Sequence, residues 1–370
     1  MRAMITGGGT GGHIYPALAI AEGIKKKYKG AEIIYVGSDL GLEKDLATRA
    51  GYEFKGITVE GLTRKLRVRT IVTLLKNMKG ISQSKKLLKE YNPDIVIGTG
   101  GYACGPLMLA ASQKGYPTLL HEQNAVMGMT NGILSSHVDR ICLTFNIMDG
   151  SIKDPNKAVI TGLPVRENIM KSDKKQGMEF FGLNPQKPVV LVTGGSQGAK
   201  HINDVSIAVC RKIIDAGGQV LHLTGPKLYK DSEKQAKEAG VFNDENYKIL
   251  SYLHEMEMAL GAADIIISRS GASFLAEIMA VGRCSVLVPY PYATGNHQEA
   301  NAVSLVNRNA ARMILDKDLN EDSLWSVLNP LLQNKDEVAE MAKNCYEMGR
   351  RDAVDNILRQ AEEVMKNKAQ

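Results

Sequence analysis

The chain has 370 residues, 44% of them hydrophobic, with 36 glycines and a formal net charge of +6. This length suits about two domains, each with its own core. Its five cysteines and seven histidines are scattered without CxxC or HxxxH pairs, which argues against a disulfide framework and a zinc site. No secretory signal is recognised, and no apolar run approaches the ~20 residues of a membrane-spanning helix. We therefore expect a cytosolic protein without a metal ion, which can still contact a membrane.

Short β-branched runs alternate with longer amphipathic segments, a pattern typical of parallel sheets covered by helices. Helices are predicted in most gaps between the strands, and the charged tail from about residue 337 is also predicted to be helical. The sequence therefore predicts an α/β fold. The predicted strands are residues 2–6, 32–36, 95–99, 118–122, 140–143 and 158–161 in the first half, and 188–193, 219–223, 247–250, 264–268, 285–288 and 311–314 in the second.

Two of these strands run into Gly-rich turns that open a helix. The turns lie in MITGGGTGGH at residues 4–13 and in VLVTGGSQGA at residues 190–199. Glycines let the backbone approach an anion, and the N–H groups of a helix start attract it. Neither turn has the Lys–Ser/Thr pair of a P-loop. We interpret them as the starts of two Rossmann-like domains joined near residues 162–165.

Each turn also has simpler or different interpretations. A tight turn alone explains either of them, and the GxGxxG spacing from Gly7 to Gly12, with Asp39 after the second strand, leaves a dinucleotide enzyme open. Further polar loops follow predicted strands, and such loops meet at one edge of a parallel sheet, where ligands bind. Helix capping and ordinary surface loops are the alternatives. These loops are residues 98–106, 121–124, 268–277 and 295–302.

Seven segments together resemble the MurG glycosyltransferases of peptidoglycan synthesis. Leu163 departs from the family pattern, which usually has Asn there, whereas Arg166 is retained. The segments span nearly the whole chain in order: GGGTGGHIYPALA at 7–19, GTGGYACGP at 98–106, HEQNAVMG at 121–128, LPVR at 163–166, GGSQGA at 194–199, RSGASFLAE at 269–277 and GNHQEANA at 295–302.

The resemblance implies a GT-B fold, in which two Rossmann-like domains turn their parallel sheets toward a common cleft. Residues 1–163 would bind the acceptor and the membrane, with a helix of about 345–370 packed back on them, and residues 164–344 would bind UDP-GlcNAc. The implied reaction moves GlcNAc from UDP-GlcNAc to undecaprenyl-pyrophosphoryl-MurNAc-pentapeptide (lipid I) with inversion, giving lipid II, without a cofactor. It would take place at the cytoplasmic face of the cell membrane, with other cell-wall synthesis proteins as candidate partners.

The resemblance also assigns site residues. The helix start after residue 271 is expected to hold the diphosphate, Glu277 to accept ribose hydroxyls, and the Leu253 backbone to contact the uracil. Thr10, Gly11, Gly12 and Asn124, on the cleft face of the first domain, are also implied to bind UDP-GlcNAc. The implied UDP-GlcNAc site of the second domain comprises Arg166, Ser196, Leu253, Ala272, Ser273, Phe274, Leu275, Ala276, Glu277 and Gln298.

Two residues are candidates for the general base that deprotonates the acceptor hydroxyl. His13 and Glu122 both lie at predicted strand ends that face the expected cleft, and a base must come within hydrogen-bond reach of its proton. Asp316 and Asp318 form an Asp-x-Asp motif, which we interpret as a surface turn far from the site rather than as a metal ligand.

Residues 61–89 contain nine basic residues and no acidic one. Anionic lipids attract such residues by ~1 kcal/mol each near the surface, so we expect this segment to bind an anionic membrane. A solvated helix face with a buried apolar stripe is the alternative, and the absence of aromatic residues argues against nucleic acid. The basic residues are Arg64, Lys65, Arg67, Arg69, Lys76, Lys79, Lys85, Lys86 and Lys89, interleaved with Leu66, Val68, Ile71, Val72, Leu74, Leu75 and Met78.

Three other functions stay open from sequence alone. The fold could serve another lipid glycosyltransferase or a UDP-GlcNAc epimerase. A non-catalytic nucleotide-sugar-binding protein at the membrane is the alternative from a different class. Turnover of UDP-GlcNAc with an acceptor distinguishes all three.

Overall fold

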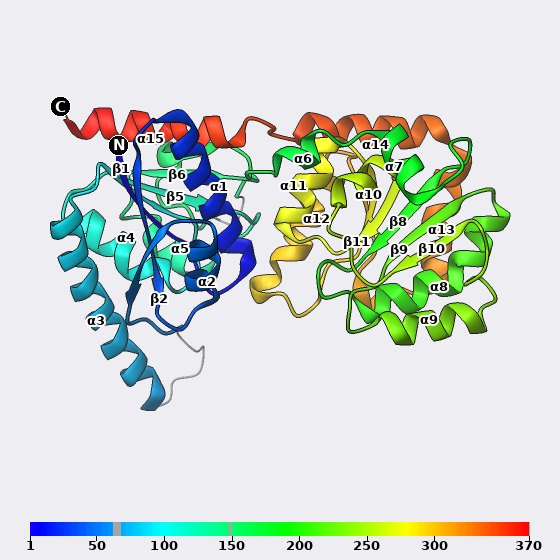
Figure 1. Ribbon diagram of the computed structural model, residues 1–370, viewed down its shortest axis with the longest axis horizontal. Helices are drawn as coiled ribbons and strands as arrows, with labels where there is room; N and C mark the ends of the chain where they lie inside the picture. The colour runs from blue at the N-terminus through cyan, green and yellow to red at the C-terminus, as the bar shows by residue number, and fades with distance from the viewer. Residues whose placement is uncertain (62–67, 148–149, 370) are drawn as a thin grey trace. The chain divides into compact units, whose positions relative to one another are not determined.

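The computed structural model describes residues 1–61, 68–147 and 150–369 (Figure 1). It divides into two compact units. The first unit comprises Met1–Pro164 together with Asp352–Gln370, and the second comprises Val165–Arg351. The predicted boundary, after residue 163, lies next to the boundary between these units.

The first unit contains a seven-stranded parallel sheet with the order β3-β2-β1-β4-β5-β6-β7. The order reverses between β1 and β4, because the chain builds outward through β2 and β3 and then returns to the other side of β1. In such sheets this switch point is where ligands bind, outside the carboxyl ends of the strands. The strands are β1 (Arg2–Thr6), β2 (Glu32–Ser38), β3 (Glu53–Ile57), β4 (Ile95–Gly98), β5 (Thr118–Glu122), β6 (Arg140–Leu143) and β7 (Ala158–Ile160).

Helices cover both faces of this sheet (Figure 1). Alternate residues of β1 point to opposite faces: Ala3 and Ile5 pack with α1, α2 and α15, whereas Met4 packs with α3, α4 and α5. Both faces are therefore apolar, as expected for a central parallel strand. The helices are α1 (Gly11–Lys27), α2 (Leu42–Arg49), α3 (Val68–Tyr91), α4 (Cys104–Gln113), α5 (Met129–Leu134) and α15 (Ala353–Ala369), with a 3-10 turn η1 (Pro155–Lys157).

The second unit repeats this plan with six parallel strands in the order β10-β9-β8-β11-β12-β13. Its switch point lies between β8 and β11, so the loops after these strands meet there. The strands are β8 (Val189–Thr193), β9 (Gln219–Leu223), β10 (Tyr247–Leu250), β11 (Ile265–Ser268), β12 (Cys284–Leu287) and β13 (Arg312–Met313).

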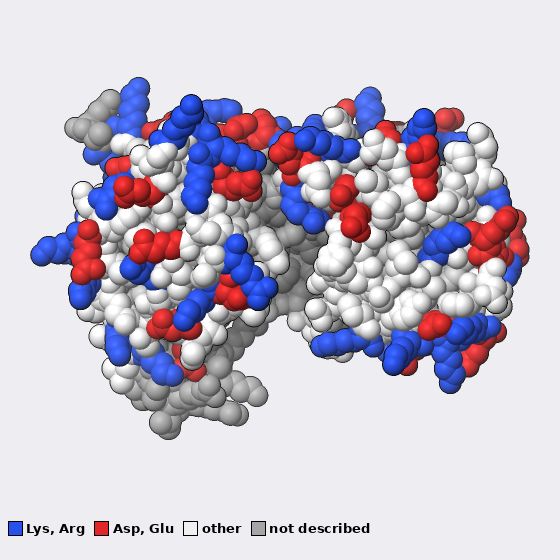
Figure 2. Space-filling model, in the orientation of Figure 1, with Lys and Arg blue, Asp and Glu red and all other residues white. Residues whose placement is uncertain are grey.

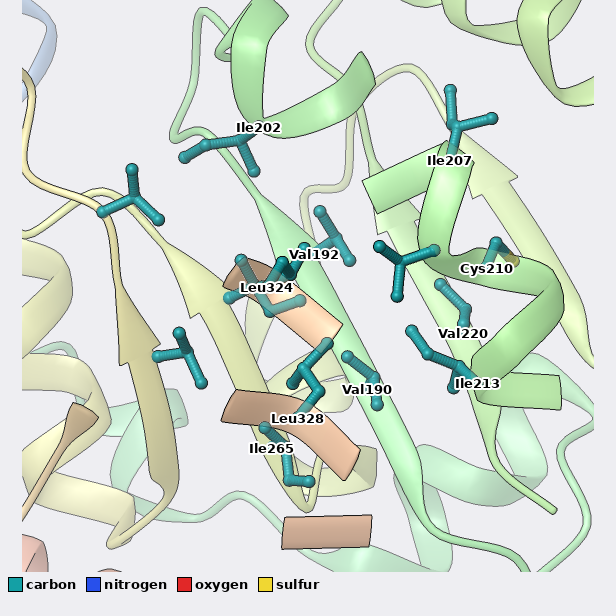
Figure 3. Packing of buried hydrophobic residues seen from close by; sticks show 14 of the residues in the cluster. Val190, Val192, Ile202, Ile207, Cys210, Ile213, Val220, Ile265, Leu324 and Leu328 are labelled. Carbon is teal, nitrogen blue, oxygen red and sulfur yellow. The ribbon is translucent and has the colours of Figure 1, made fainter. Parts of the chain in front are cut away.

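One part of the core of the second unit lies between its sheet and the helices α8 and α13. Val190 and Val192 of β8 lie in one cluster with Ile213 of α8 and Leu328 of α13, and all four side chains are fully buried (Figure 3). The helical elements are α6 (Glu167–Met170), α7 (Lys174–Phe181), α8 (Lys200–Asp215), α9 (Tyr229–Glu238), α10 (Met256–Ala262), α11 (Ala272–Val281), η2 (Thr294–Asn296), α12 (His297–Val306), η3 (Asp316–Asp318), α13 (Glu321–Gln333) and α14 (Lys335–Met348).

Every predicted strand overlaps a strand of the structure, and the two parallel sheets confirm the predicted α/β class. The sequence analysis missed β3, an edge strand whose EFKGI sequence lacks an apolar run. The predicted C-terminal helix was partly wrong. Residues 345–351 belong to the second unit, where Cys345 is fully buried, and only α15 packs back on the first unit, against α1.

Candidate active site

The loops after β1 and β4 are joined at the switch point of the first unit. The Gly8 amide donates to the Gly100 carbonyl at 3.2 Å. Gly101 has a φ of +78°, and a Cβ built on it would lie 1.9 Å from the Gly8 carbonyl oxygen. Only glycine fits this close contact, so the Gly-rich sequences of both loops serve to bring them together.

The first Gly-rich turn also contains an internal carboxylate. Glu43 is fully buried, and its two carboxylate oxygens accept the amides of Ser38 at 3.0 Å and of Gly9 at 3.3 Å. A negative charge already occupies the inner side of this turn, which disfavours a phosphate at the Gly9 amide. This geometry argues against the dinucleotide enzyme that the sequence left open.

The start of α1 stays open to a ligand. Thr10 is its N-cap residue and makes no side-chain cap, so the next amides, of Gly11 and Gly12, lie at an uncapped helix terminus. The first amides of a helix have no intrahelical acceptor. They can therefore hold an anionic or hydroxyl group of a substrate.

His13 lies in the first turn of α1 and is half-buried. Its Nδ1 lies 3.1 Å from the Thr99 carbonyl oxygen and 3.0 Å from Oε1 of Gln123. Both are acceptors, so the proton of the neutral imidazole is assigned to Nδ1 and the lone pair to Nε2. This tautomer is the one that a general base requires.

Glu122, the other candidate base, is 1% exposed and already accepts four hydrogen bonds. Oε1 accepts from the amide and the side chain of Asn124, and Oε2 accepts from the Gly128 amide at 3.1 Å and from Asn131 at 2.8 Å. Such a carboxylate fixes the loop that follows β5. The geometry favours His13 over Glu122 as the base.

Asn131 belongs to the hydrogen-bond network of Glu122, and the sequence analysis did not name it. It is 1% exposed and donates to both Glu122 and the His121 carbonyl. It lies in the short helix α5, nine residues beyond Glu122, with no motif of its own to indicate a role. Its contact with the His121-Glu122 strand end could be recognised only in three dimensions.

The second unit has a pocket of about 680 Å³ at the carboxyl ends of its central strands. The second Gly-rich turn forms one wall, and residues 290–292 after β12 form another. Of the residues predicted to bind UDP-GlcNAc, the lining includes Ser196, Phe274 and Gln298, whereas Leu253 lies in the loop after β10 and is not part of it.

The N-terminus of α11 is free to bind an anion. Its N-cap, Gly271, makes no side-chain cap and lines the pocket. The Leu275 amide already donates to the Gly271 carbonyl, at 3.0 Å, which leaves the amides of Ala272, Ser273 and Phe274 as the unpaired first-turn donors. Leu275 and Ala276 are 0% and 5% exposed, so their side chains pack in the core rather than in the pocket.

Arg166 and Glu277 form an ion pair. Nε and Nη2 of Arg166 donate to Oε1 of Glu277 at 3.2 and 2.9 Å. Burial raises the pKa of the Glu277 carboxyl, and the Arg166 guanidinium opposes this rise. The predicted site residues Arg166 and Glu277 are thus adjacent, and Oε2 of Glu277 takes no part in this pair.

The interpretation of Asp316 as a surface residue far from the site is wrong. Asp316 lines the pocket, and its Oδ1 accepts from Arg269 at 2.5 Å while Oδ2 lies 3.3 Å from Nδ1 of His201. Because β13 runs parallel to β12, the turn that follows β13 lies at the same edge of the sheet as the other loops that line the pocket. Arg269 also donates to the carbonyls of Val288 and Pro289. It therefore connects the loops that follow β11, β12 and β13.

Two glycosyltransferase domain descriptions match the chain. Residues 3–143 match the glycosyltransferase family 28 N-terminal domain, and residues 189–357 match the glycosyltransferase family 28 C-terminal domain. The chain is 42% identical to the UDP-N-acetylglucosamine--N-acetylmuramyl-(pentapeptide) pyrophosphoryl-undecaprenol N-acetylglucosamine transferase of Desulforamulus reducens over 99% of both chains. It is 44% identical to the protein of that name from Caldanaerobacter subterraneus, over 95% of this chain and 97% of the relative.

Solved structures agree with these matches. The crystal structure of Acinetobacter baumannii MurG has a TM-score of 0.80 and 26% identity, covering 98% of this chain and 99% of that one. The UDP-GlcNAc 2-epimerase of Neisseria meningitidis, at 13% identity and a TM-score of 0.68 over 98% of this chain and all of that one, shares the fold alone. The predicted resemblance and GT-B fold are confirmed, and the chain belongs to glycosyltransferase family 28 and, within it, to the MurG family of N-acetylglucosamine transferases.

Proposed function

We propose that this chain transfers GlcNAc from UDP-GlcNAc to undecaprenyl-pyrophosphoryl-MurNAc-pentapeptide, with inversion at the anomeric carbon. The observation that carries the proposal is its 42% identity over 99% of the chain to a transferase named for these substrates. Two further observations support it: the uncapped start of α1 in the first unit and the pocket at the strand ends of the second unit.

The pocket of the second unit is suited to the donor. The free amides at the start of α11 and the dipole of that helix can hold the diphosphate, and Ser196 of the second Gly-rich turn lies in the same pocket. Glu277 is not among the residues that line this pocket, and we assign its Oε2 to a ribose hydroxyl and Gln298, which does line the pocket, to the sugar. We assign Leu253 to the uracil through its backbone, from the loop after β10.

The first unit is suited to the acceptor. Nε2 of His13 accepts the proton of the attacking hydroxyl, the oxygen bonds to the anomeric carbon, and the bond from that carbon to the diphosphate breaks. The amides at the start of α11 stabilise the negative charge that develops on UDP, because the helix fixes their orientation before the reaction. Thr10, Gly11 and Gly12 bind substrate beside the base, and Asn124 shapes the neighbouring loop through Glu122.

A donor–acceptor assay tests this function. With UDP-GlcNAc and a short-chain lipid I analogue, we expect stoichiometric release of UDP and formation of the disaccharide product. Release of no UDP identifies a nucleotide-sugar-binding protein, and conversion of UDP-GlcNAc without acceptor identifies an epimerase. Transfer to a glycolipid acceptor in place of the analogue identifies a different lipid glycosyltransferase. Each of these three outcomes rejects the proposal.

We also propose that α3 contacts the cytoplasmic surface of the membrane that carries the acceptor. Its buried side includes Thr73 and Ser84, whereas Leu74, Leu75 and Met78 are 49%, 61% and 65% exposed. The C-terminal half of α3 does bury apolar residues such as Leu88, but the exposed apolar residues next to lysines in its N-terminal half are typical of interfacial helices.

Part of the basic segment lies outside this description. Residues 62–67, with Arg64, Lys65, Leu66 and Arg67, are outside the described residues, as are the side chains of 68–72. Two of the described lysines are paired with flanking acids, Lys76 with Glu60 and Lys86 with Glu90. On the face in Figure 2, basic and acidic side chains are intermixed. The apolar residues of α3 therefore carry the membrane proposal as much as its charge does. Among the described residues, no helix is long and apolar enough to span a bilayer.

A further inference from the structure

A series of hydrogen bonds, most of them buried, leads to His13 from the Gly162 carbonyl. Nε2 of His121 lies 2.8 Å from the Gly162 carbonyl oxygen, and Nδ1 of His121 lies 3.1 Å from Nε2 of Gln123. Oε1 of Gln123 then lies 3.0 Å from Nδ1 of His13. His121 and Gln123 are 0% and 2% exposed, so solvent does not compete for the bonds between them and from His121 to Gly162.

The Gly162 carbonyl fixes the direction of the hydrogen bonds in this series. A carbonyl only accepts, so His121 carries its proton on Nε2 and its Nδ1 must accept. The Gln123 amide nitrogen supplies that bond, and it also donates to the Thr99 carbonyl at 2.8 Å. The Gln123 oxygen is thereby turned toward His13, whose Nδ1 must donate.

We propose that Gln123, held by His121, is a positioning residue that keeps His13 in the tautomer with its proton on Nδ1 and its lone pair on Nε2. The inference rests on the proposed function only for its catalytic consequence, because the tautomer itself is a property of the free protein. Without Gln123, the Thr99 carbonyl is the one remaining protein acceptor at Nδ1 among the described residues, and the other tautomer, which cannot accept a proton at Nε2, becomes accessible.

The other buried histidine provides an internal reference. His222 is fully buried in the second unit, and burial lowers its pKa to about 3, so it is neutral at pH 7. Its Nε2 lies 3.1 Å from Oδ1 of Asn203, whose amide nitrogen donates to the Thr224 carbonyl. His222 therefore carries its proton on Nε2, as His121 does, whereas His13 carries it on Nδ1.

The test is nuclear magnetic resonance of the full chain labelled with [15N]histidine, in which two-bond 1H–15N correlations distinguish the tautomers. A His13→Asn spectrum assigns the His13 signals. We expect His13 as Nδ1–H and His121 and His222 as Nε2–H in the unsubstituted protein. Gln123→Met removes one of the two acceptors at Nδ1 and leaves the Thr99 carbonyl, so we expect the His13 signals to shift partway toward the Nε2–H pattern while His222 stays unchanged.

Kinetics then connect the tautomer with turnover. General base catalysis contributes ~10²–10⁴-fold, so Gln123→Met is expected to lower kcat by about tenfold or more while KM for UDP-GlcNAc stays within about twofold. Gln219→Met is the matched control, since Gln219 is an equally buried glutamine, 2% exposed, in the second unit. It should change neither the His13 signals nor kcat.

Several outcomes overturn the proposal. An Nε2–H signal for His13 in the unsubstituted protein rejects it without any variant, so a Gln123→Met protein that fails to fold does not leave it untested. An unchanged tautomer in folded Gln123→Met also rejects it, and a changed tautomer with unchanged kcat rejects the catalytic role. If the unsubstituted protein transfers no GlcNAc, the proposed function fails, yet the spectra still decide the tautomer.

Discussion

At the residue scale, Glu277 combines a cost in stability with a proposed role in donor binding. Burial raises the pKa of its carboxyl, so folding favours the protonated form, and the stability that this provides is lost as the pH rises through the folded-state pKa. Above that pH the protein keeps an ionised, buried carboxylate beside Arg166. Functional sites commonly retain such groups at the expense of stability.

Glu277→Gln should therefore separate stability from binding. We expect the free energy of unfolding of the second unit to be higher in the variant at pH 8, with the difference disappearing as the pH falls toward about 4, where the unfolded carboxyl protonates. The KM for UDP-GlcNAc should rise about tenfold, because a hydrogen bond to a charged group contributes ~1.5–3 kcal/mol. Denaturant melts across this pH range and initial rates measure both effects.

A second Arg–Glu pair in the same unit serves as the control. Nη2 of Arg312 lies 2.8 Å from Glu337, and both side chains are partly exposed. Glu337→Gln should leave KM unchanged, and its effect on stability should be small because exposed ion pairs contribute ~0–1 kcal/mol. A Glu277→Gln protein that binds the donor normally would remove Glu277 from the site.

The sequence predicted the position of a candidate site residue only where that residue lies in a motif. His13, Ser196 and Gln298 lie in Gly-rich or amide-rich segments that follow strands. The structure places each of them near the carboxyl ends of a parallel sheet. Asp316 could not be placed in this way, because β13 has only two residues and the strand order that brings its end to the pocket is a property of the whole sheet. Asn131 depends likewise on a contact between segments.

At the element scale, the pattern of apolar residues predicted β1 and β8 well and β3 poorly. Central strands are buried on both faces and are apolar throughout, as Ala3–Ile5 and Val190–Val192 are. The edge strand β3 pairs with β2 alone and alternates charged with apolar residues, so its sequence resembles a loop. In α3 the apolar residues predicted a helix, but only the packing reveals which of them face outward.

The outward face of α3 makes a testable prediction about membranes. Leu75→Gln combined with Met78→Gln should weaken binding to anionic vesicles at least tenfold, because burying one such side chain contributes ~1.5–3 kcal/mol. Lys79→Glu should weaken it further at low salt, since each basic residue contributes ~1 kcal/mol and salt screens the attraction. Vesicle sedimentation at two ionic strengths measures these effects.

The matched control reverses a lysine on another helix. Lys230 is exposed on α9 of the second unit, and Lys230→Glu changes the net charge as much as Lys79→Glu does. If the two charge reversals weaken vesicle binding equally, net charge rather than α3 governs the interaction. Vesicle binding that is unaffected by the two Gln substitutions rejects the apolar contact.

At the scale of the whole molecule, the last helix returns to the first unit. Ile357, Leu358 and Ala361 of α15 are 0–1% exposed and pack with α1 and the central strands. Close packing extends to Gly23, where a Cβ would lie 2.2 Å from Val354. Each large aliphatic side chain buried in this way contributes ~1.5–3 kcal/mol, so α15 supplies a substantial part of the 5–15 kcal/mol that usually stabilises a domain.

We therefore predict that the two units respond separately to core substitutions, although α15 follows the second unit in the chain. Leu358→Ala should cost about 2–5 kcal/mol and lower the melting temperature of the first unit by about 5–15 °C. Leu328→Ala, an equally buried change in α13, should lower the transition of the second unit instead. Calorimetry with and without UDP identifies the transitions, because a ligand stabilises the unit that binds it. If Leu358→Ala lowers the transition that UDP raises, α15 stabilises the donor-binding unit and the division of the chain proposed here is wrong.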